Sequence, residues 1–202
     1  MIRALLLDLG NVLVGFDHSL TLARLEEATG KPAASLRPHV YGPAVRAFEL
    51  GRLDTDAFFR AAEAAAGLPR VPDAVWIPAW RDIFTRDEAA LALLPRLAAG
   101  VDPILVSNTN ALHWEGVLRV APELARFFPR RALSFEVGAA KPDPAHFVAA
   151  LALAGAAPHE SVFADDRTEN VDAARAMGID AFRVTGAKDL AGALRARDLL
   201  AE

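Results

Sequence analysis

The sequence predicts an α/β protein, built as a doubly wound, mostly parallel, Rossmann-like sheet in three layers with an inserted helical domain. Short apolar runs without alternation recur along the chain, as expected of strands buried on both faces of a parallel sheet. Helical patterns rather than hairpin turns separate these runs, which indicates right-handed crossovers. Almost a hundred residues lie between the first run and the second, far more than one crossover needs.

Five apolar runs are the predicted strands. In chain order they cover residues 2–7, 103–106, 131–135, 161–164 and 180–184. The carboxyl ends of parallel strands meet at one edge of the sheet, where open α/β proteins bind their ligands. Polar residues that directly follow these runs are therefore the first candidates for a functional site.

Two helices of the sheet domain have readable ends. Asp143 is placed to cap a helix that begins at Pro144 and continues to Gly155. A second helix begins near residue 167 and stops at Gly178. The residues just before this second helix therefore lie in a strand-to-helix loop.

The long segment after the first strand is predicted to be a helical domain over residues 16–83, so that residues 1–15 and 84–202 form the core. Apolar residues at helical spacing end at Gly30, Gly51 and Gly67. Short hinges are expected near residues 15–18 and 80–86. Large aromatic residues are expected to form the interior of this domain, namely Phe48, Phe58, Trp76 and Trp80.

Composition narrows the classes of partner. The chain has 202 residues with a net charge of −4, and its arginines are scattered among acids, so neither nucleic acid nor an anionic membrane surface is expected as a partner. No stretch approaches the roughly 20 apolar residues that span a bilayer. The absence of cysteine excludes disulfides, thiolate metal sites and a cysteine nucleophile. We expect a cytoplasmic protein, monomeric or homodimeric, that binds a small molecule.

Candidate functional residues follow four of the predicted strands or their connections. Asp8, a candidate nucleophile, follows the first strand, Ser107 follows the second, Lys141 follows the third, and Asp165 and Asp166 follow the fourth. Carboxylates gathered at one edge repel one another unless a cation is present. Lys141 supplies one positive charge, and Mg²⁺, which prefers oxygen ligands, would supply two.

Each of these residues also has a purely structural explanation. Asp8 alone could cap a turn, Lys141 could be a solvated surface lysine, and the acidic pair could favour the positive end of the following helix. Their joint occurrence favours a functional site. Asn170 could orient the metal-binding loop or satisfy the first turn of a helix. Three histidines show no ligand spacing and are interpreted as surface or helix-end residues, namely His39, His146 and His159.

The order and spacing of four segments resemble the four motifs of the haloacid dehalogenase (HAD) superfamily of hydrolases. These segments are Asp8-Leu9-Gly10-Asn11-Val12-Leu13, Ser107-Asn108-Thr109-Asn110, Lys141-Pro142 and Asp165-Asp166. The resemblance covers essentially the whole chain, and residues 48–54 are similar to part of the small helical (C1-type) cap found in many members. The first two motifs are similar to a subgroup that includes sugar-phosphate phosphatases.

The resemblance implies a magnesium-dependent phosphatase that acts on a small phosphorylated metabolite. Asp8 would attack phosphorus and form an aspartyl-phosphate. The phosphoryl oxygens would be held by Ser107, Asn108, Lys141 and Asn11. Lys141 would also neutralise charge on the transferring group.

The resemblance also implies the ligands of Mg²⁺. They would be Asp8, the backbone carbonyl of Gly10 and Asp166, with Asp165 either bound directly to the metal or holding the residues that bind it. Glycine does not weaken the contribution at position 10, because every residue has a backbone carbonyl.

Gly10 departs from the pattern in another respect. Many phosphatases of this family carry a second aspartate at this position, where it protonates the leaving oxygen and later activates water. A positioned acid-base contributes about 10²- to 10⁴-fold, so the enzyme is slow, the leaving group is good, or another group substitutes. Asp17 is the nearest acidic candidate, although it is also placed to cap a helix that starts near Ser19. His113 is a second candidate.

Three other functions compete. A 2-haloacid dehalogenase would use Asp8 to attack carbon and would need no acid, but it would leave the acidic pair without a purpose. A signalling receiver domain has its acidic pair after the first strand and no helical insert. A non-catalytic protein could keep the same pocket to bind a phosphorylated ligand, and Gly10 leaves this possibility open.

Overall fold

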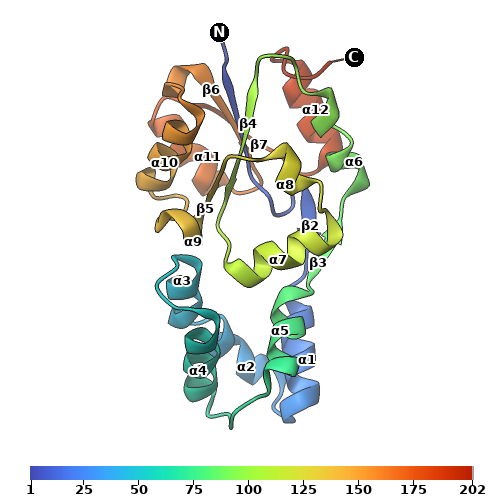
Figure 1. Cartoon of the computed structure of the whole chain (residues 1–202), viewed down its shortest axis with the longest axis vertical. Helices are drawn as coiled ribbons and strands as arrows, with labels where there is room; N and C mark the ends of the chain where they lie inside the picture. The colour runs from blue at the N-terminus through green and yellow to red at the C-terminus, as the bar shows by residue number, and fades with distance from the viewer. Residues whose placement is uncertain (202) are drawn as a thin grey trace.

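A five-stranded parallel sheet forms the centre of the protein, in the order β5–β4–β1–β6–β7 (Figure 1). The computed structural model describes residues 1–201. The strands of this sheet are β1 (Ala4–Leu7), β4 (Asp102–Ser107), β5 (Arg131–Leu133), β6 (Ser161–Asp165) and β7 (Asp180–Arg183). The predicted fold class is confirmed, and β1 lies between two parallel neighbours, which explains its uninterrupted apolar sequence.

Helices cover both faces of the sheet. Leu5 and Leu7 of β1 pack into one apolar cluster and Leu6 packs into another, as the alternation of side chains along a strand requires. The helices that contribute to the first cluster are α6 (Glu88–Leu91), α7 (Ala111–Val120), α8 (Leu124–Phe127) and α12 (Ala187–Arg195). The second cluster is covered by α10 (Pro144–Ala154) and α11 (Thr168–Ala176). The sheet and its two helical layers make up the three layers of the core.

The ends of these elements are set by local hydrogen bonds. Asp143 accepts a hydrogen bond from the Ala145 amide at 2.9 Å, and Gly155 ends α10 in the left-handed conformation, as the sequence predicts. β5 ends at Leu133, earlier than predicted, because Ser134 begins the short helix α9 (Ser134–Val137). Two 3₁₀ turns complete the core, namely η1 (Leu94–Arg96) and η2 (Pro158–Glu160).

The segment between β1 and β4 is mostly helical and forms its own apolar cluster at the end of the molecule away from both termini (Figure 1). Its first five helices are α1 (Ser19–Thr29), α2 (Ala33–Val40), α3 (Pro43–Glu49), α4 (Thr55–Ala66) and α5 (Asp73–Arg81). We call these helices the insert. The four aromatic residues predicted to form its interior are all buried. The sequence pattern gave no indication of α2, which contains Pro38 and has no side-chain cap.

A two-stranded antiparallel sheet joins the insert to the core. β2 (Val14–Phe16) pairs with β3 (Phe84–Arg86). These strands lie where the sequence predicted two hinges, so paired backbone connects the two parts. No helix within residues 1–201 has the length and apolar character needed to cross a membrane.

The insert also touches the core through a close contact between α5 and α7. A Cβ atom added at Gly116 of α7 would lie 2.1 Å from the carbonyl oxygen of Arg81 at the end of α5. Only glycine therefore allows this approach.

We expect Gly116→Ala to lower the free energy of unfolding by about 1–3 kcal/mol, because the added methyl group forces the two helices apart. Gly192→Ala in α12 is the matched control, since a Cβ there meets no atom within 4 Å. The control should stabilise the protein by about 0.5–1 kcal/mol, the usual difference between glycine and alanine in a helix. Urea unfolding measures both, and equal stability of Gly116→Ala and wild type would contradict the close contact.

Candidate active site

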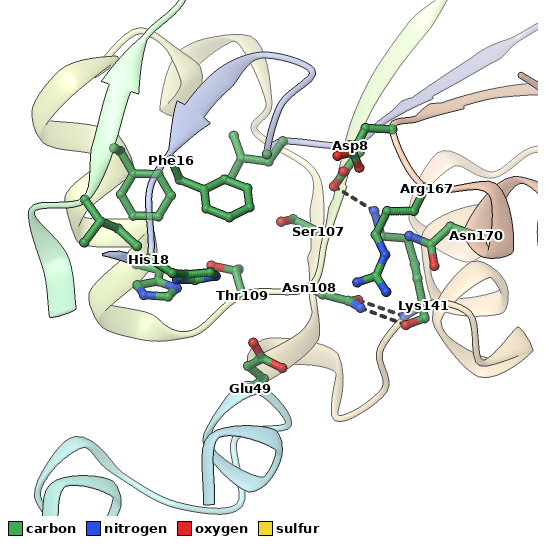
Figure 2. A pocket seen from close by; sticks show the side chains of 16 residues that line it. Asp8, Phe16, His18, Glu49, Ser107, Asn108, Thr109, Lys141, Arg167 and Asn170 are labelled. Atoms are coloured by element: carbon green, nitrogen blue, oxygen red, sulfur yellow. Dashed lines mark hydrogen bonds and ion pairs between the residues drawn. The ribbon is translucent and has the colours of Figure 1, made fainter. Parts of the chain in front are cut away.

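The polar residues that follow the strands gather around one cavity at the carboxyl edge of the sheet (Figure 2). Asp8 follows β1, Ser107 ends β4, and Lys141 lies in the loop between α9 and α10. The cavity has a volume of about 130 Å³ and is lined by residues of the core and of the insert. A cavity of this size suits a small ligand.

The ammonium group of Lys141 forms the centre of the site. Its Nζ atom donates hydrogen bonds to Asp8 Oδ1, to Asp165 Oδ2 and to the carbonyl oxygen of Val106, each at 2.7 Å. The side chain is only 1% exposed. An ammonium group has three donors, and all three are used here. Lys141 is therefore fixed between the ends of β1 and β6.

Burial and charge set the protonation of this cluster. Burial and the neighbouring Asp165 carboxylate raise the pKa of Asp8 to about 7, although Lys141 acts in the opposite direction. Burial lowers the pKa of Lys141, but the two carboxylates outweigh it and the net shift is upward. The site thus holds one charged ammonium group. This single positive charge does not balance the carboxylates around it.

The two adjacent acids after β6 are held differently. Asp165 is fully buried, and its Oδ1 accepts hydrogen bonds from the Arg167 amide at 2.8 Å and from the Asn170 side chain at 2.9 Å. Asp166 lines the cavity and accepts a hydrogen bond from Asn11 Nδ2 at 3.0 Å. Asn170 therefore orients the loop that carries Asp165 and Asp166, which we call the acidic loop. This is one of the two roles that the sequence allowed for Asn170.

Three carboxylates come close enough to share one cation. One oxygen from each of Asp8, Asp165 and Asp166 can be chosen so that all lie within 4.8 Å of one another. The oxygens of Asp165 are already engaged by Lys141, Arg167 and Asn170. Asp8 and Asp166 each keep one carboxylate oxygen without a hydrogen bond from another side chain among residues 1–201.

The backbone of Lys141 is held by two side chains. Asn108 donates to the Lys141 carbonyl at 2.7 Å and accepts from the Lys141 amide at 2.8 Å. His146 Nδ1 also accepts from this amide, at 3.0 Å, so Nε2 carries the proton and donates to the Ala132 carbonyl at 2.8 Å. Both residues therefore position Lys141.

His146 is a helix-end residue, one of the two alternatives expected for it, but it is not a surface residue. His146 lies in the first turn of α10, but its side chain is fully buried. The spacing expected of metal ligands could not reveal the role of His146, because its partners are backbone groups of Lys141 and Ala132. His39 and His159 are exposed, as expected.

Gly10 lines the cavity, and the place of its missing side chain is filled by an aromatic ring. A Cβ atom added at Gly10 would lie 2.7 Å from Cε1 of Phe16. Phe16 comes from β2, the strand that leads into the insert. A longer acidic side chain at position 10 would require this ring to move.

Two of the residues expected in the site do not line the cavity. Asp17 is exposed, is not part of the cavity wall, and accepts a hydrogen bond from the Ser19 amide at 2.8 Å. Hydrogen bonds from Ser19 lower the pKa of Asp17, which keeps it ionised and unsuited to donate a proton. Asn11 is also exposed, and its side chain supports Asp166 instead of facing the cavity.

His113 lines the cavity but is not a cationic acid. Asn110 Oδ1 accepts from Trp80 Nε1 at 3.2 Å, so Asn110 Nδ2 is left to donate to His113 Nδ1 at 3.1 Å. Burial lowers the pKa of His113 to about 3, with a smaller contribution from His18. The imidazole is therefore neutral near pH 7.

Several residues of the cavity wall were not predicted as site residues, although one of them, Glu49, lies in the segment 48–54 that resembles part of a cap. They are Phe16, His18, Glu49, Phe84 and Arg167. Except for Arg167, these residues come from the insert or from the strands that join it to the core. Their position depends on how the insert sits over the sheet, which no local pattern encodes.

A parallel sheet with an aspartate after its first strand, a buried lysine and a paired acidic loop defines a class of hydrolase. A sequence profile of the haloacid dehalogenase-like hydrolases matches residues 2–178. The chain belongs to this family.

Solved structures show the same fold. A HAD family enzyme from Bacteroides thetaiotaomicron is 27% identical, with a TM-score of 0.85 over 96% of this chain and 98% of that chain. The same enzyme in complex with magnesium and inorganic phosphate gives 27% identity and a TM-score of 0.79 over 91% and 94%. L-2-haloacid dehalogenase from Xanthobacter autotrophicus is 20% identical, with a TM-score of 0.64 over 91% and 78%, and this likeness concerns the fold alone.

The buried, neutral His146 predicts a dependence of stability on pH. Burial lowers its pKa to about 4, whereas in the unfolded chain it titrates near 6.5. The unfolded state therefore takes up a proton first as the pH falls from about 6.5 to 4, and stability is lost over this range. The contribution is about 3 kcal/mol.

We expect His146→Gln to remove this part of the pH dependence of the free energy of unfolding. His39→Gln, an exposed site on α2, should keep the wild-type slope. Urea unfolding at pH values between 4 and 7 measures the difference. A His146→Gln slope equal to that of wild type would show that His146 is not buried in its neutral form.

Proposed function

We propose that this protein is a magnesium-dependent phosphatase that hydrolyses a small phosphorylated metabolite through an aspartyl-phosphate on Asp8. The observation that carries the proposal is the Lys141 ammonium group, which is hydrogen-bonded to both Asp8 and Asp165 at 2.7 Å beside Asp166. The HAD family enzyme from Bacteroides thetaiotaomicron, in complex with magnesium and inorganic phosphate, supports the same chemistry here.

The donor set fits magnesium. Three carboxylates lie close together and Lys141 pairs with only two of them, which leaves an excess of negative charge that a divalent cation would balance. Asp8, Asp166 and the backbone carbonyl of Gly10 would hold the ion, because Asp165 is engaged in holding Lys141. When bound, magnesium neutralises charge on the phosphoryl group and fixes its orientation.

The residues of the chain divide the reaction between them. Asp8 is the nucleophile: its carboxylate forms a bond to phosphorus as the bond from phosphorus to the leaving oxygen breaks. The hydroxyl of Ser107 donates a hydrogen bond to a phosphoryl oxygen, and Lys141 turns one of its three donors from Asp8 to another phosphoryl oxygen when the substrate binds. Water then attacks phosphorus, the bond to Asp8 breaks, and inorganic phosphate leaves.

Among residues 1–201, the site has no positioned acid to protonate the leaving group. Position 10 carries no side chain, Phe16 fills the space, Asp17 lies outside the cavity wall, and His113 is neutral. Without a positioned acid, the rate should depend strongly on the stability of the leaving anion.

We further propose that the insert, as residues 16–83, acts as a cap. It would close over the cavity, exclude water and contact the leaving group. The contribution of α3 and of the segment around His18 to the cavity wall supports this role. Sugar phosphates are the leading substrate class, as the resemblance of the first two motifs implies.

The acidic loop favours this function over a dehalogenase. A carbon-halogen substrate needs no divalent cation, so Asp166 would have no role in its cleavage. A non-catalytic protein with the same pocket would bind magnesium and phosphate but would not turn over any ester.

The decisive assay is hydrolysis of p-nitrophenyl phosphate, an ester with a good leaving group, with magnesium and with EDTA. We expect activity that requires magnesium and falls at least about 10³-fold in Asp8→Asn, because the amide is no nucleophile. Asp172→Asn, an exposed site on α11, is the matched control and should keep wild-type activity.

Activity of Asp8→Asn equal to that of wild type would exclude the assigned nucleophile. No activity of the wild type with any magnesium concentration would favour a haloacid substrate or the non-catalytic function.

A further inference from the structure

Glu49 is a carboxylate of the cavity that the proposed chemistry does not use. It is the last residue of α3 and lies at the insert side of the cavity, at the opposite end from Asp8 (Figure 2). The side chain is half-buried. Among residues 1–201 Glu49 has no side-chain hydrogen bond and no cationic partner within 4.0 Å, and it lines the cavity.

The position of Glu49 is unfavourable for the free protein. A negative charge at the carboxyl end of a helix opposes the helix dipole. Burial raises the pKa of Glu49, although Arg46 and Arg167 act against this shift. A partly buried carboxylate without a partner costs free energy. The residue therefore does not serve the stability of α3.

Aromatic rings line the same cavity as Glu49 and Asp8. Phe16 lies next to His18, with ring centroids 4.9 Å apart, and next to Phe84, at 6.4 Å. All three residues line the cavity. A ligand between the two acids would thus meet apolar ring faces on one side and a hydrogen-bond acceptor at its far end, an arrangement typical of small-molecule sites.

We propose that Glu49 selects the substrate by accepting hydrogen bonds from hydroxyl groups of the leaving group, while the phosphoryl group lies at Asp8. The substrate class is a phosphate monoester of a polyhydroxylated alcohol. This inference rests on the proposed phosphatase function and assigns its substrate recognition to a residue of the insert.

Charge around Glu49 favours hydroxyl groups over an ammonium group on the substrate. Arg167 lines the same cavity, and Arg46 lies one turn away on α3. Both carry positive charge near Glu49 and would repel a cationic leaving group. Neutral hydroxyl groups can donate to the carboxylate without this repulsion.

The test compares two esters with the same type of leaving atom. Hexose 6-phosphates and n-butyl phosphate both release a primary alkoxide, but only the hexose carries further hydroxyl groups. We expect Glu49→Ala and Glu49→Gln to lower kcat/KM for the preferred hexose ester about 10- to 100-fold, the effect of losing hydrogen bonds to a charged acceptor. The kcat/KM for n-butyl phosphate should change less than about twofold.

Glu27→Gln, an exposed site on α1, is the matched control and should change neither value. Three results would overturn the proposal: equal losses on both esters, no loss on either, or a wild type that does not prefer any hexose ester to n-butyl phosphate. Hydrolysis of p-nitrophenyl phosphate by the wild type separates a failure of the phosphatase function from a failure of the role assigned to Glu49. If it occurs and the Glu49 variants keep their selectivity, this inference alone fails; if it does not occur, the proposed function fails first.

Discussion

A single buried ammonium group holds the site together. A buried charge is tolerated only when it is paired and fully hydrogen-bonded, and Lys141 meets this requirement with two carboxylates and one carbonyl. These acceptors belong to three different strands or strand ends, so the position of Lys141 depends on the register of the sheet. Asn108 and His146 fix its backbone, which ties the second and third motifs to each other.

The insert completes a site that the sheet begins. The core supplies Asp8, which we propose as the nucleophile, together with the Lys141 ammonium group and the acidic loop, all at one edge of the sheet. The insert and its two short strands supply the opposite wall, where Phe16 occupies the place of a side chain at position 10 and Glu49 faces the cavity. In the proposed function, reaction chemistry and substrate choice are thus assigned to different parts of the fold.

Much of this arrangement could be predicted from the sequence, because the relevant signals are local. Strands buried on both faces must be apolar throughout, Asp143 and Gly155 bound their helix by ordinary capping, and the polar residues after the strands meet at one edge. Pairing of β2 with β3 could not be predicted, since each is three residues long and the partners are distant in sequence. The burial of His146 and the exposure of Glu49 to the cavity depend on tertiary contacts in the same way. Asp17 and Asn11 do not line the cavity, because proximity to a motif does not fix the direction of a side chain.

The proposed mechanism requires that Asp8 becomes phosphorylated during turnover. Acid quenching of the wild type during hydrolysis of p-nitrophenyl phosphate, followed by proteolysis and mass spectrometry, tests it directly. We expect a phosphoryl group on the peptide that contains Asp8, formed only with magnesium and absent from Asp8→Asn. Turnover accompanied by a phosphoryl group on another residue, such as His18 or His113, would contradict it.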